Sequence, residues 1–273
     1  MTISEWLKES ARTLNDSGIE TARLDAIVLL SDALKKDKTW ILAYPEHILQ
    51  GSILKILNKK VIQRCNFIPL AYIRGRAEFY GREFVVNKSV LIPRPESESI
   101  IELLQKTRSD KRQTIIDVGT GSGCLAITAK LEFPDYAVFA IDIDEDALQV
   151  ARKNAEALQA EISFLQSDLL KCLQPSAFNL QHSVLLANLP YVPTSYPINK
   201  AAAHEPALAL FSGDDGLDHY RKLFEHTMKL PQQPYAIITE TLFTQHKKMN
   251  DLATNAGYEQ KESDGLAQLF VLR

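Results

Sequence analysis

The sequence of 273 residues lacks the features that mark a membrane or secreted protein. No apolar run approaches the roughly 18 residues that a membrane-spanning helix requires. The start, Met1 to Lys8, has neither the basic segment nor the apolar segment of a secretory signal. We therefore expect no membrane partner, and the cytoplasm is the expected location.

Cysteine is scarce, and there is no large excess of charge of one sign. The chain has only Cys65, Cys124 and Cys172, which form no C-x-x-C pair, so a disulfide framework and a structural metal site are not expected. The formal net charge of −3 provides no global basic field for nucleic acid, although a local basic patch stays open. No direct nucleic-acid partner is expected, and a monomer is assumed.

The composition, with 45% hydrophobic and 24% charged residues, is typical of a globular protein. The length allows one large or two modest domains. Residues 1–74 are predicted to be helical, because apolar residues such as Trp6, Leu7 and Leu14 recur at helical spacing. Gly18 is expected to end the first helix and Thr21 to cap the second. This region is interpreted as a small bundle, with a grip on a macromolecular partner as the functional alternative.

The pattern changes after Pro69. The alternation of Phe84 and Val86, and then of Val90 and Ile92, predicts a β-hairpin with its turn near residues 87–88. Residues 75–95 are assigned to this linker.

Two prolines make the end of the linker stiff. Pro93 and Pro95 fix φ and restrict the residues before them, and Ser97 suits the start of a helix. Arg94, between the prolines, is either an ordinary surface residue or a guanidinium held in place.

From about residue 112, short β-rich runs alternate with helical runs, which predicts an α/β fold with a mostly parallel sheet. The expected strands are 114–118, 137–142, 162–166, 184–187, 235–240, 258–262 and 268–272. The expected helices are 124–132, 145–158, 217–228 and 244–256. The last two strands must be antiparallel, because too few residues separate them for a parallel crossover.

A glycine-rich stretch follows the first of these strands, with the sequence Asp117-Val118-Gly119-Thr120-Gly121-Ser122-Gly123. Glycines let a backbone turn tightly and approach a ligand, whereas a purely structural turn is the alternative. Cys124 stands where a dinucleotide site requires its third glycine, so the pattern favours a nucleoside without pyrophosphate, of which S-adenosyl-L-methionine is the obvious one.

Three residues after later strands extend this hypothesis. Asp142 ends the second strand about 20 residues on, where an acidic side chain meets ribose hydroxyls. Asp168 is expected to accept from the adenine amino group, and Leu169 to pack on the ring. An exposed acidic turn is nearly as good an interpretation of Asp168 alone.

The tetrapeptide Asn188-Leu189-Pro190-Tyr191 follows another apolar run, so it leaves the same edge of the sheet. The side-chain carbonyl of Asn188 and the backbone carbonyl of Leu189 can accept the two N–H groups of a planar amide or aryl amine. Pro190 stiffens the turn, and Tyr191 can lie against the flat acceptor. Methyl transfer needs little more than such positioning, with no general base of low pKa.

In these stretches the chain resembles the HemK/PrmC family of protein-(glutamine-N5) methyltransferases, which modify peptide chain release factors. The resemblance runs nearly end to end. It rests on residues 69–75, 79–86 and 90–98, on the glycine loop and the tetrapeptide, and on residues 205–210 and 213–217.

The resemblance implies a class I methyltransferase domain over residues 96–273, behind the helical domain and the hairpin linker. The implied reaction is methylation of the glutamine in the Gly-Gly-Gln motif of release factors, which tunes translation termination. The cofactor S-adenosyl-L-methionine is assigned to residues 119–123, Asp142, Leu169 and Asn188, and the substrate to residues 188–191.

The chain departs from the family pattern at several places, among them residues 179–183, which differ from the usual entry to a strand. Leu189 stands for a usual proline, Leu169 for an aromatic residue, Thr241 for a glycine and Gln268 for an arginine. Two other functions remain open. The tetrapeptide is shared with DNA adenine-N6 methyltransferases, whose flipped base presents the same amine. A non-enzymatic nucleoside-binding protein is the other alternative.

Overall fold

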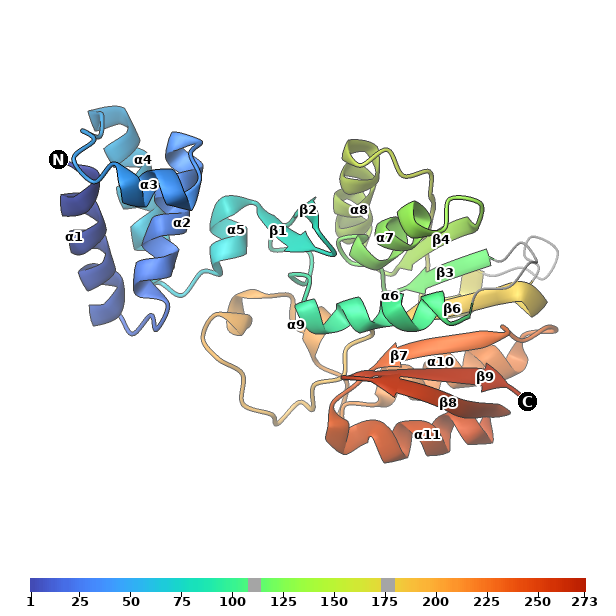
Figure 1. Ribbon diagram of the computed structural model, residues 1–273. Helices are drawn as coiled ribbons and strands as arrows, with labels where there is room; N and C mark the ends of the chain where they lie inside the picture. The colour runs from blue at the N-terminus through green and yellow to red at the C-terminus, as the bar shows by residue number, and fades with distance from the viewer. Residues whose placement is uncertain (108–113, 173–179) are drawn as a thin grey trace. The chain divides into compact units, whose positions relative to one another are not determined.

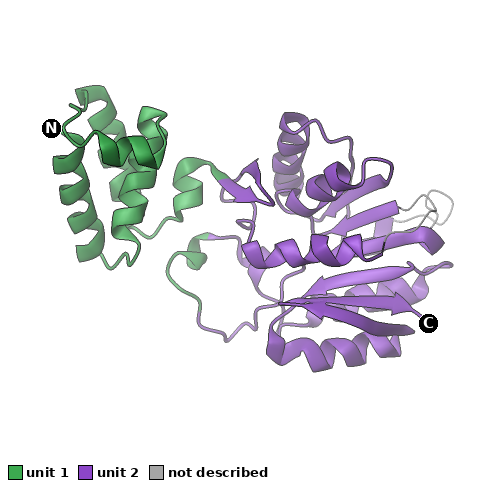
Figure 2. Cartoon of the chain, viewed as in Figure 1, with its two compact units in different colours: residues 1–76, 198–204 green, residues 77–197, 205–273 purple. Residues whose placement is uncertain are grey.

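The computed structural model describes residues 1–107, 114–172 and 180–273. The chain forms two compact units (Figure 2). The first, here called the helical unit, contains residues 1–76 and 198–204. The second, the sheet unit, contains residues 77–197 and 205–273. Each unit is described by itself.

The helical unit packs around Trp6, Leu29 and Leu57, as the apolar spacing predicted. Its helices are α1 (Ile3–Asp16), α2 (Ala22–Leu34), α3 (Lys38–Ala43), α4 (Gly51–Cys65) and α5 (Leu70–Arg74). The predicted cap at Thr21 is wrong in its chemistry, because its side chain makes no capping hydrogen bond. The side-chain cap that the sequence analysis missed is at Thr2, where a capping box with Glu5 closes the start of α1.

Residues 198–204 join the helical unit although they lie far along the chain. The Nζ of Lys200 lies 4.4 Å from the ring centre of Phe67. The Nε2 of His204 lies 2.9 Å from the backbone oxygen of Asn66. The segment that follows the tetrapeptide therefore packs on the end of α4.

A β-hairpin is present, but the prediction is wrong about both its turn and its second strand, because residues 90–92 form no strand. The strands are β1 (Arg76–Phe79) and β2 (Arg82–Val85), and Tyr80 and Gly81 connect them, both with positive φ, as in a tight hairpin turn. Phe84, Val86 and Val90 are buried as the alternation required. The cause of the error is that an extended segment lying on a core shows the same alternation as a paired strand.

The sheet unit contains a seven-stranded sheet in the order β5-β4-β3-β6-β7-β9-β8 (Figure 1). The strands are β3 (Thr114–Val118), β4 (Ala137–Asp142), β5 (Ser163–Gln166), β6 (Ser183–Ala187), β7 (Ala236–Glu240), β8 (Tyr258–Asp264) and β9 (Ala267–Leu272). The first five are parallel, and β9 runs antiparallel to both β7 and β8. The predicted α/β fold with an antiparallel end is confirmed.

Both faces of the sheet are buried. Ile115 and Leu186 face the core formed with α6 (Glu98–Gln105) and α7 (Cys124–Glu132). Ile116 and Leu185 face the core formed with α10 (Asp218–Lys229) and α11 (His246–Asn255). The remaining helices are α8 (Glu145–Ala157) and α9 (Ala207–Leu210), with short 3₁₀ turns at Pro95–Ser97, Leu169–Cys172, Leu180–His182, Ala202–His204 and Phe243–Gln245. This double covering explains why the parallel strands are continuous apolar runs.

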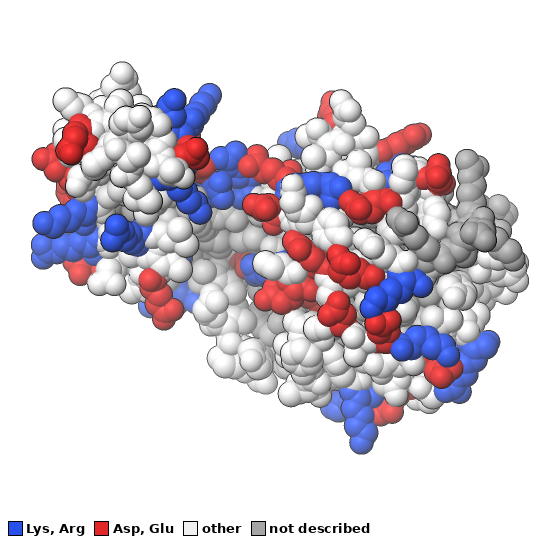
Figure 3. Space-filling view, viewed as in Figure 1, with Lys and Arg blue, Asp and Glu red and all other residues white. Residues whose placement is uncertain are grey.

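Charge is unevenly divided between the units. The helical unit carries more Lys and Arg than Asp and Glu, whereas the sheet unit carries the acidic excess that gives the chain its net −3. On the face drawn in Figure 3, acidic side chains gather over the sheet unit. Within the described residues, no helix is long and apolar enough to cross a membrane.

The helical unit holds one nearly buried ion pair, between Arg64 Nε and Asp25 Oδ2 at 2.6 Å. The same guanidinium donates to the backbone oxygen of Ile68 at 3.3 Å. Arg64→Leu should lower the free energy of unfolding by about 3 kcal/mol, because it leaves the Asp25 carboxylate buried and unpaired.

Urea unfolding measures this loss, and Arg12→Leu is the matched control. Its pair with Asp16 spans 3.7 Å between highly exposed side chains, so its removal should cost less than about 1 kcal/mol. Equal losses in the two variants would contradict the role of the buried pair.

Candidate active site

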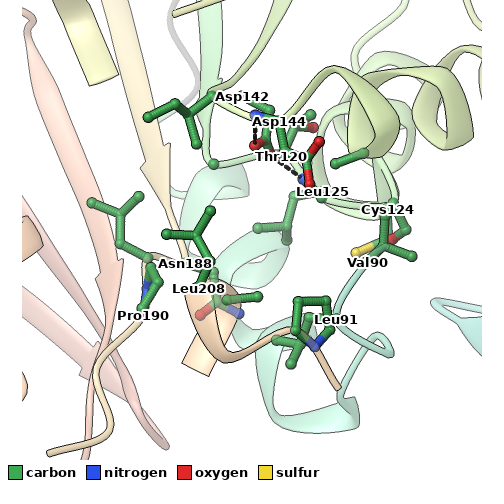
Figure 4. A pocket seen from close by; sticks show the side chains of 18 of the residues that line it. Val90, Leu91, Thr120, Cys124, Leu125, Asp142, Asp144, Asn188, Pro190 and Leu208 are labelled. Carbon is green, nitrogen blue, oxygen red and sulfur yellow. Dashed lines mark hydrogen bonds between the residues drawn. The ribbon is translucent and has the colours of Figure 1, made fainter. Parts of the chain in front are cut away.

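The glycine loop and the tetrapeptide meet at one pocket of the sheet unit (Figure 4). They leave the neighbouring strands β3 and β6, and the chain crosses from β3 to β4 on the other side, so the pocket lies where the strand order reverses. The pocket-lining residues among the predicted site residues are Gly119, Thr120, Gly121, Ser122, Asp142, Asp168, Leu169, Asn188, Leu189 and Pro190. Asp117, Gly123 and Tyr191 are not part of this lining.

The glycine loop has a backbone that other residues adopt only with strain. Gly119, Gly121 and Gly123 have φ of 76°, 55° and 81°. A Cβ on Gly119 would lie 2.9 Å from Cδ2 of Leu189, so the loop and the tetrapeptide touch there. A Cβ on Gly121 would meet nothing within 4 Å. The loop is therefore closed against the tetrapeptide and open at its middle glycine.

Asp117 supports this loop through hydrogen bonds to its buried side chain. Its side chain is fully buried, and Oδ2 accepts from Thr120 Oγ1 at 2.6 Å and from the Ala126 N–H at 3.2 Å. Burial raises the pKa of Asp117 to about 7, although these two donors oppose the rise. Asp117 thus acts on the loop through hydrogen bonds within the protein.

Asp142 lies on the pocket wall, on the opposite side from Asn188 in Figure 4. Its Oδ2 accepts from the Gly121 N–H at 2.8 Å, and Oδ1 from the Asp144 N–H at 3.0 Å. Burial raises the pKa of Asp142, and the same backbone donors oppose this. Each oxygen has lone pairs left, so the carboxylate is oriented and can still accept from a hydroxyl group.

Asp168 and Leu169 line the pocket beyond β5. The side chain of Asp168 is 40% exposed and pairs with Lys171 Nζ, which lowers the pKa of the carboxyl group. Leu169 is buried and has a φ of 52°, an unusual conformation for a bulky residue. Its side chain gives the pocket an apolar wall.

Two neighbouring carbonyl oxygens of the tetrapeptide, Asn188 Oδ1 and Leu189 O, accept no hydrogen bond from the described residues. The side-chain Nδ2 of Asn188 donates to Ser97 Oγ at 2.7 Å, which fixes the direction of the amide. Two acceptor atoms on adjacent residues at a pocket suit a ligand with two N–H donors.

Glu240 lies beside the tetrapeptide at the end of β7, and it is 1% exposed. Its Oε1 accepts from the Tyr191 hydroxyl at 2.9 Å. Burial raises the pKa of Glu240, opposed by the side chains of Ser97, Tyr191 and Asn188. Burial and the neighbouring Glu240 likewise raise the pKa of Tyr191. The Tyr191 ring is therefore held by a buried acid.

Arg94 is held in place, which decides between the two interpretations of this residue. Its guanidinium pairs with the buried Glu205, whose Oε2 also accepts from the Ile92 N–H at 3.1 Å. One carboxylate therefore ties the proline-rich end of the linker to the segment before α9, and both flank the pocket.

Sequence reasoning missed Ser97, Glu205 and Glu240 as parts of the site. Ser97 was interpreted only as a helix start, yet its hydroxyl makes no capping bond and instead accepts from Asn188. A signal existed for Glu240, because an acidic residue that ends a buried parallel strand lies at the ligand-binding edge.

The buried Asp117 should give stability a specific pH dependence. The folded state binds its proton more tightly, so stability is full below the ordinary pKa of 3.8 and falls as pH rises to about 7. Over this interval the loss is at most on the order of 4 kcal/mol. Urea unfolding of the wild type and of Asp117→Asn at pH 4 and pH 8 should show the wild type losing relative stability at the higher pH. A difference that does not change with pH would refute this.

Two family models match the chain. One is described as the PrmC N-terminal domain and matches residues 5–75, and the other, the methyltransferase small domain, matches residues 96–195. Among solved structures, the hMettl16 catalytic domain in complex with MAT2A 3′UTR hairpin 1 has a TM-score of 0.57 at 12% identity and covers 91% of each chain. This likeness shows the fold alone.

Curated relatives give the family. A release factor glutamine methyltransferase of Koribacter versatilis (strain Ellin345) is 37% identical, over 82% of this chain and 80% of the relative. One of Bacillus subtilis (strain 168) is 34% identical, over 93% and 90%. With such identity along most of both chains, this protein belongs to the release factor glutamine methyltransferase family.

Proposed function

We propose that this protein transfers a methyl group from S-adenosyl-L-methionine to the side-chain nitrogen of the Gly-Gly-Gln glutamine of a peptide chain release factor, in the cytoplasm. The observation that carries the proposal is a pair of carbonyl oxygens, Asn188 Oδ1 and Leu189 O, to which no described residue donates a hydrogen bond; both residues line a pocket shared with the glycine loop. The names of the relatives support glutamine as the acceptor.

The pocket fits the proposed cofactor. The open backbone at Gly121 suits close approach by a ligand, and the oriented Asp142 carboxylate can accept from ribose hydroxyls. Asp168 and Leu169 would hold the adenine by a hydrogen bond and by apolar contact. When bound, S-adenosyl-L-methionine supplies a methyl group that is activated by its positive sulfur.

The protein's own part is to hold the acceptor amide. An amide nitrogen has two N–H groups and a delocalised lone pair, so it is a weak nucleophile. If Asn188 Oδ1 and Leu189 O each accept one N–H, the nitrogen is fixed in the pocket and its electron density rises. Pro190 stiffens the turn, and the anchored Tyr191 offers its ring to the flat carboxamide. The amide proton is released after transfer, so no strong base is needed.

We assign docking to the helical part of the chain. In this proposal residues 1–74 grip the release factor, residues 75–95 link the parts, and residues 96–273 carry out the reaction as a monomer. DNA adenine and a non-enzymatic binding role are less favoured, since the relatives are named for glutamine methylation.

Mass mapping of a release factor after incubation with this protein and S-adenosyl-L-methionine tests the function. One added methyl group should appear on the Gly-Gly-Gln glutamine. A methyl group found only on duplex DNA offered in parallel, or on neither substrate, would overturn the proposal.

Asn188→Ala should reduce methyl transfer about 100-fold or more, because it removes one of the two oxygens that position the amide. Cofactor binding, measured by calorimetry, should weaken only modestly. Ser97→Ala is the informative comparison, because it removes the group that orients Asn188 but keeps both carbonyl oxygens, so it should cost less than Asn188→Ala. Undiminished transfer by Asn188→Ala would refute its role.

A further inference from the structure

The hydroxyl of Tyr220 touches three backbone groups around the tetrapeptide. It lies 2.9 Å from the Ala187 oxygen and 2.6 Å from the Glu240 oxygen, and it accepts from the Leu189 N–H at 3.3 Å. Tyr220 comes from α10 and is fully buried. One side chain thus joins the ends of β6 and β7 to the residue that carries a proposed acceptor oxygen.

The position of this hydroxyl follows from the sheet. The parallel pairing of β6 with β7 ends at Ala187 and Thr239, and beyond these residues the two backbones are no longer paired as strands. The carbonyls of Ala187 and Glu240 then need another donor. A hydroxyl has one proton, so Tyr220 donates to one carbonyl at a time while its lone pair receives the Leu189 N–H. Burial raises the pKa of Tyr220 well above 10, so the proton stays at working pH.

Leu189 is held on three sides. Its N–H is bound to Tyr220, its side chain lies against Gly119, and Pro190 restricts its ψ to extended values. Its φ has no covalent constraint, unlike that of a proline in this place. The hydrogen bond to Tyr220 supplies a constraint that a proline ring would supply by itself. The group of Leu189 left without a partner among the described residues is its carbonyl oxygen.

We propose that Tyr220 is a positioning residue for methyl transfer. Its hydroxyl fixes the Asn188–Leu189 peptide group, and with it the φ of Leu189, so that the Leu189 carbonyl faces the acceptor amide. The inference rests on the proposed function. In this proposal the Tyr220 hydroxyl positions Leu189 through the hydrogen bond from the Leu189 N–H. A residue without an N–H at position 189 therefore removes this role of Tyr220.

A double-mutant cycle tests this with the full chain and a release factor. Tyr220→Phe should lower kcat about tenfold or more, with a smaller change in KM, because the acceptor is bound but held loosely. In the Leu189→Pro background, the same substitution should change kcat less than about threefold. Equal costs in both backgrounds would overturn the inference. An inactive Leu189→Pro protein would also contradict it, because a proline ring should restrict φ at residue 189 as the hydrogen bond to Tyr220 does.

Tyr258→Phe is the matched control for the loss of a buried hydroxyl. Tyr258 is fully buried in the same core, and its hydroxyl donates to the Pro234 oxygen at 2.9 Å, away from the tetrapeptide. Both variants should lose thermal stability, but only Tyr220→Phe should lose kcat. A similar fall in kcat for both would reduce Tyr220 to a structural residue.

Hydrogen exchange at the Leu189 amide gives a readout that does not depend on activity. Exchange should be slow in the wild type and in Tyr258→Phe, and at least about tenfold faster in Tyr220→Phe, because the amide loses its acceptor. Unchanged exchange in Tyr220→Phe would overturn the inference. A wild type that never methylates a release factor but shows this pattern would instead refute the proposed function and leave the hydrogen bond established.

Discussion

The proposed acceptor site depends on two carbonyl oxygens, Asn188 Oδ1 and Leu189 O, that accept no hydrogen bond from the part of the chain that the structure describes. Ser97 takes the amide nitrogen of Asn188, and Tyr220 takes the N–H of Leu189. Asn188 Oδ1 and the Leu189 carbonyl, at the exit of β6, belong to residues that line the pocket. Positioning of this kind suits an acceptor that is poor in electrons and needs orientation more than a base.

The supporting residues come from distant parts of the sequence. Ser97 precedes α6, Tyr220 lies on α10, and Glu240 ends β7. A parallel sheet brings the carboxyl ends of its strands to one edge, so these side chains meet there without being neighbours along the chain. The buried Glu205 pairs with the partly exposed Arg94 and ties the linker to the same edge.

Local patterns predicted most of the sheet unit. The bounds expected for β3, β4 and α7 agree with the structure, because buried apolar runs and glycine stops are visible in single segments. The hairpin turn was misplaced because Val86 and Val90, which follow the end of β2, are buried although they lie in no strand. The packing of residues 198–204 with α4 had no local signal, because a contact between distant segments leaves no periodicity in either.

The residues of the candidate site also fall into those that the sequence could predict and those that it could not. The glycine loop, Asp142 and Asn188 could be found from the sequence, because each follows a predicted strand and has a chemistry that suits a ligand. Ser97 and Tyr220 could not be assigned, since a serine near a helix start and a tyrosine on a helix each have an ordinary structural explanation. Glu240 could have been noticed, because it ends a buried parallel strand. The hydrogen bonds of these three residues to the tetrapeptide, which only the structure shows, are the basis of the roles proposed for them.

The most direct measurement is a crystal structure of this protein with the demethylated cofactor product and a Gly-Gly-Gln peptide. The glutamine nitrogen should lie within about 3 Å of both Asn188 Oδ1 and the Leu189 oxygen. A carboxamide bound elsewhere, or either oxygen turned away from it toward another protein group, would contradict the account.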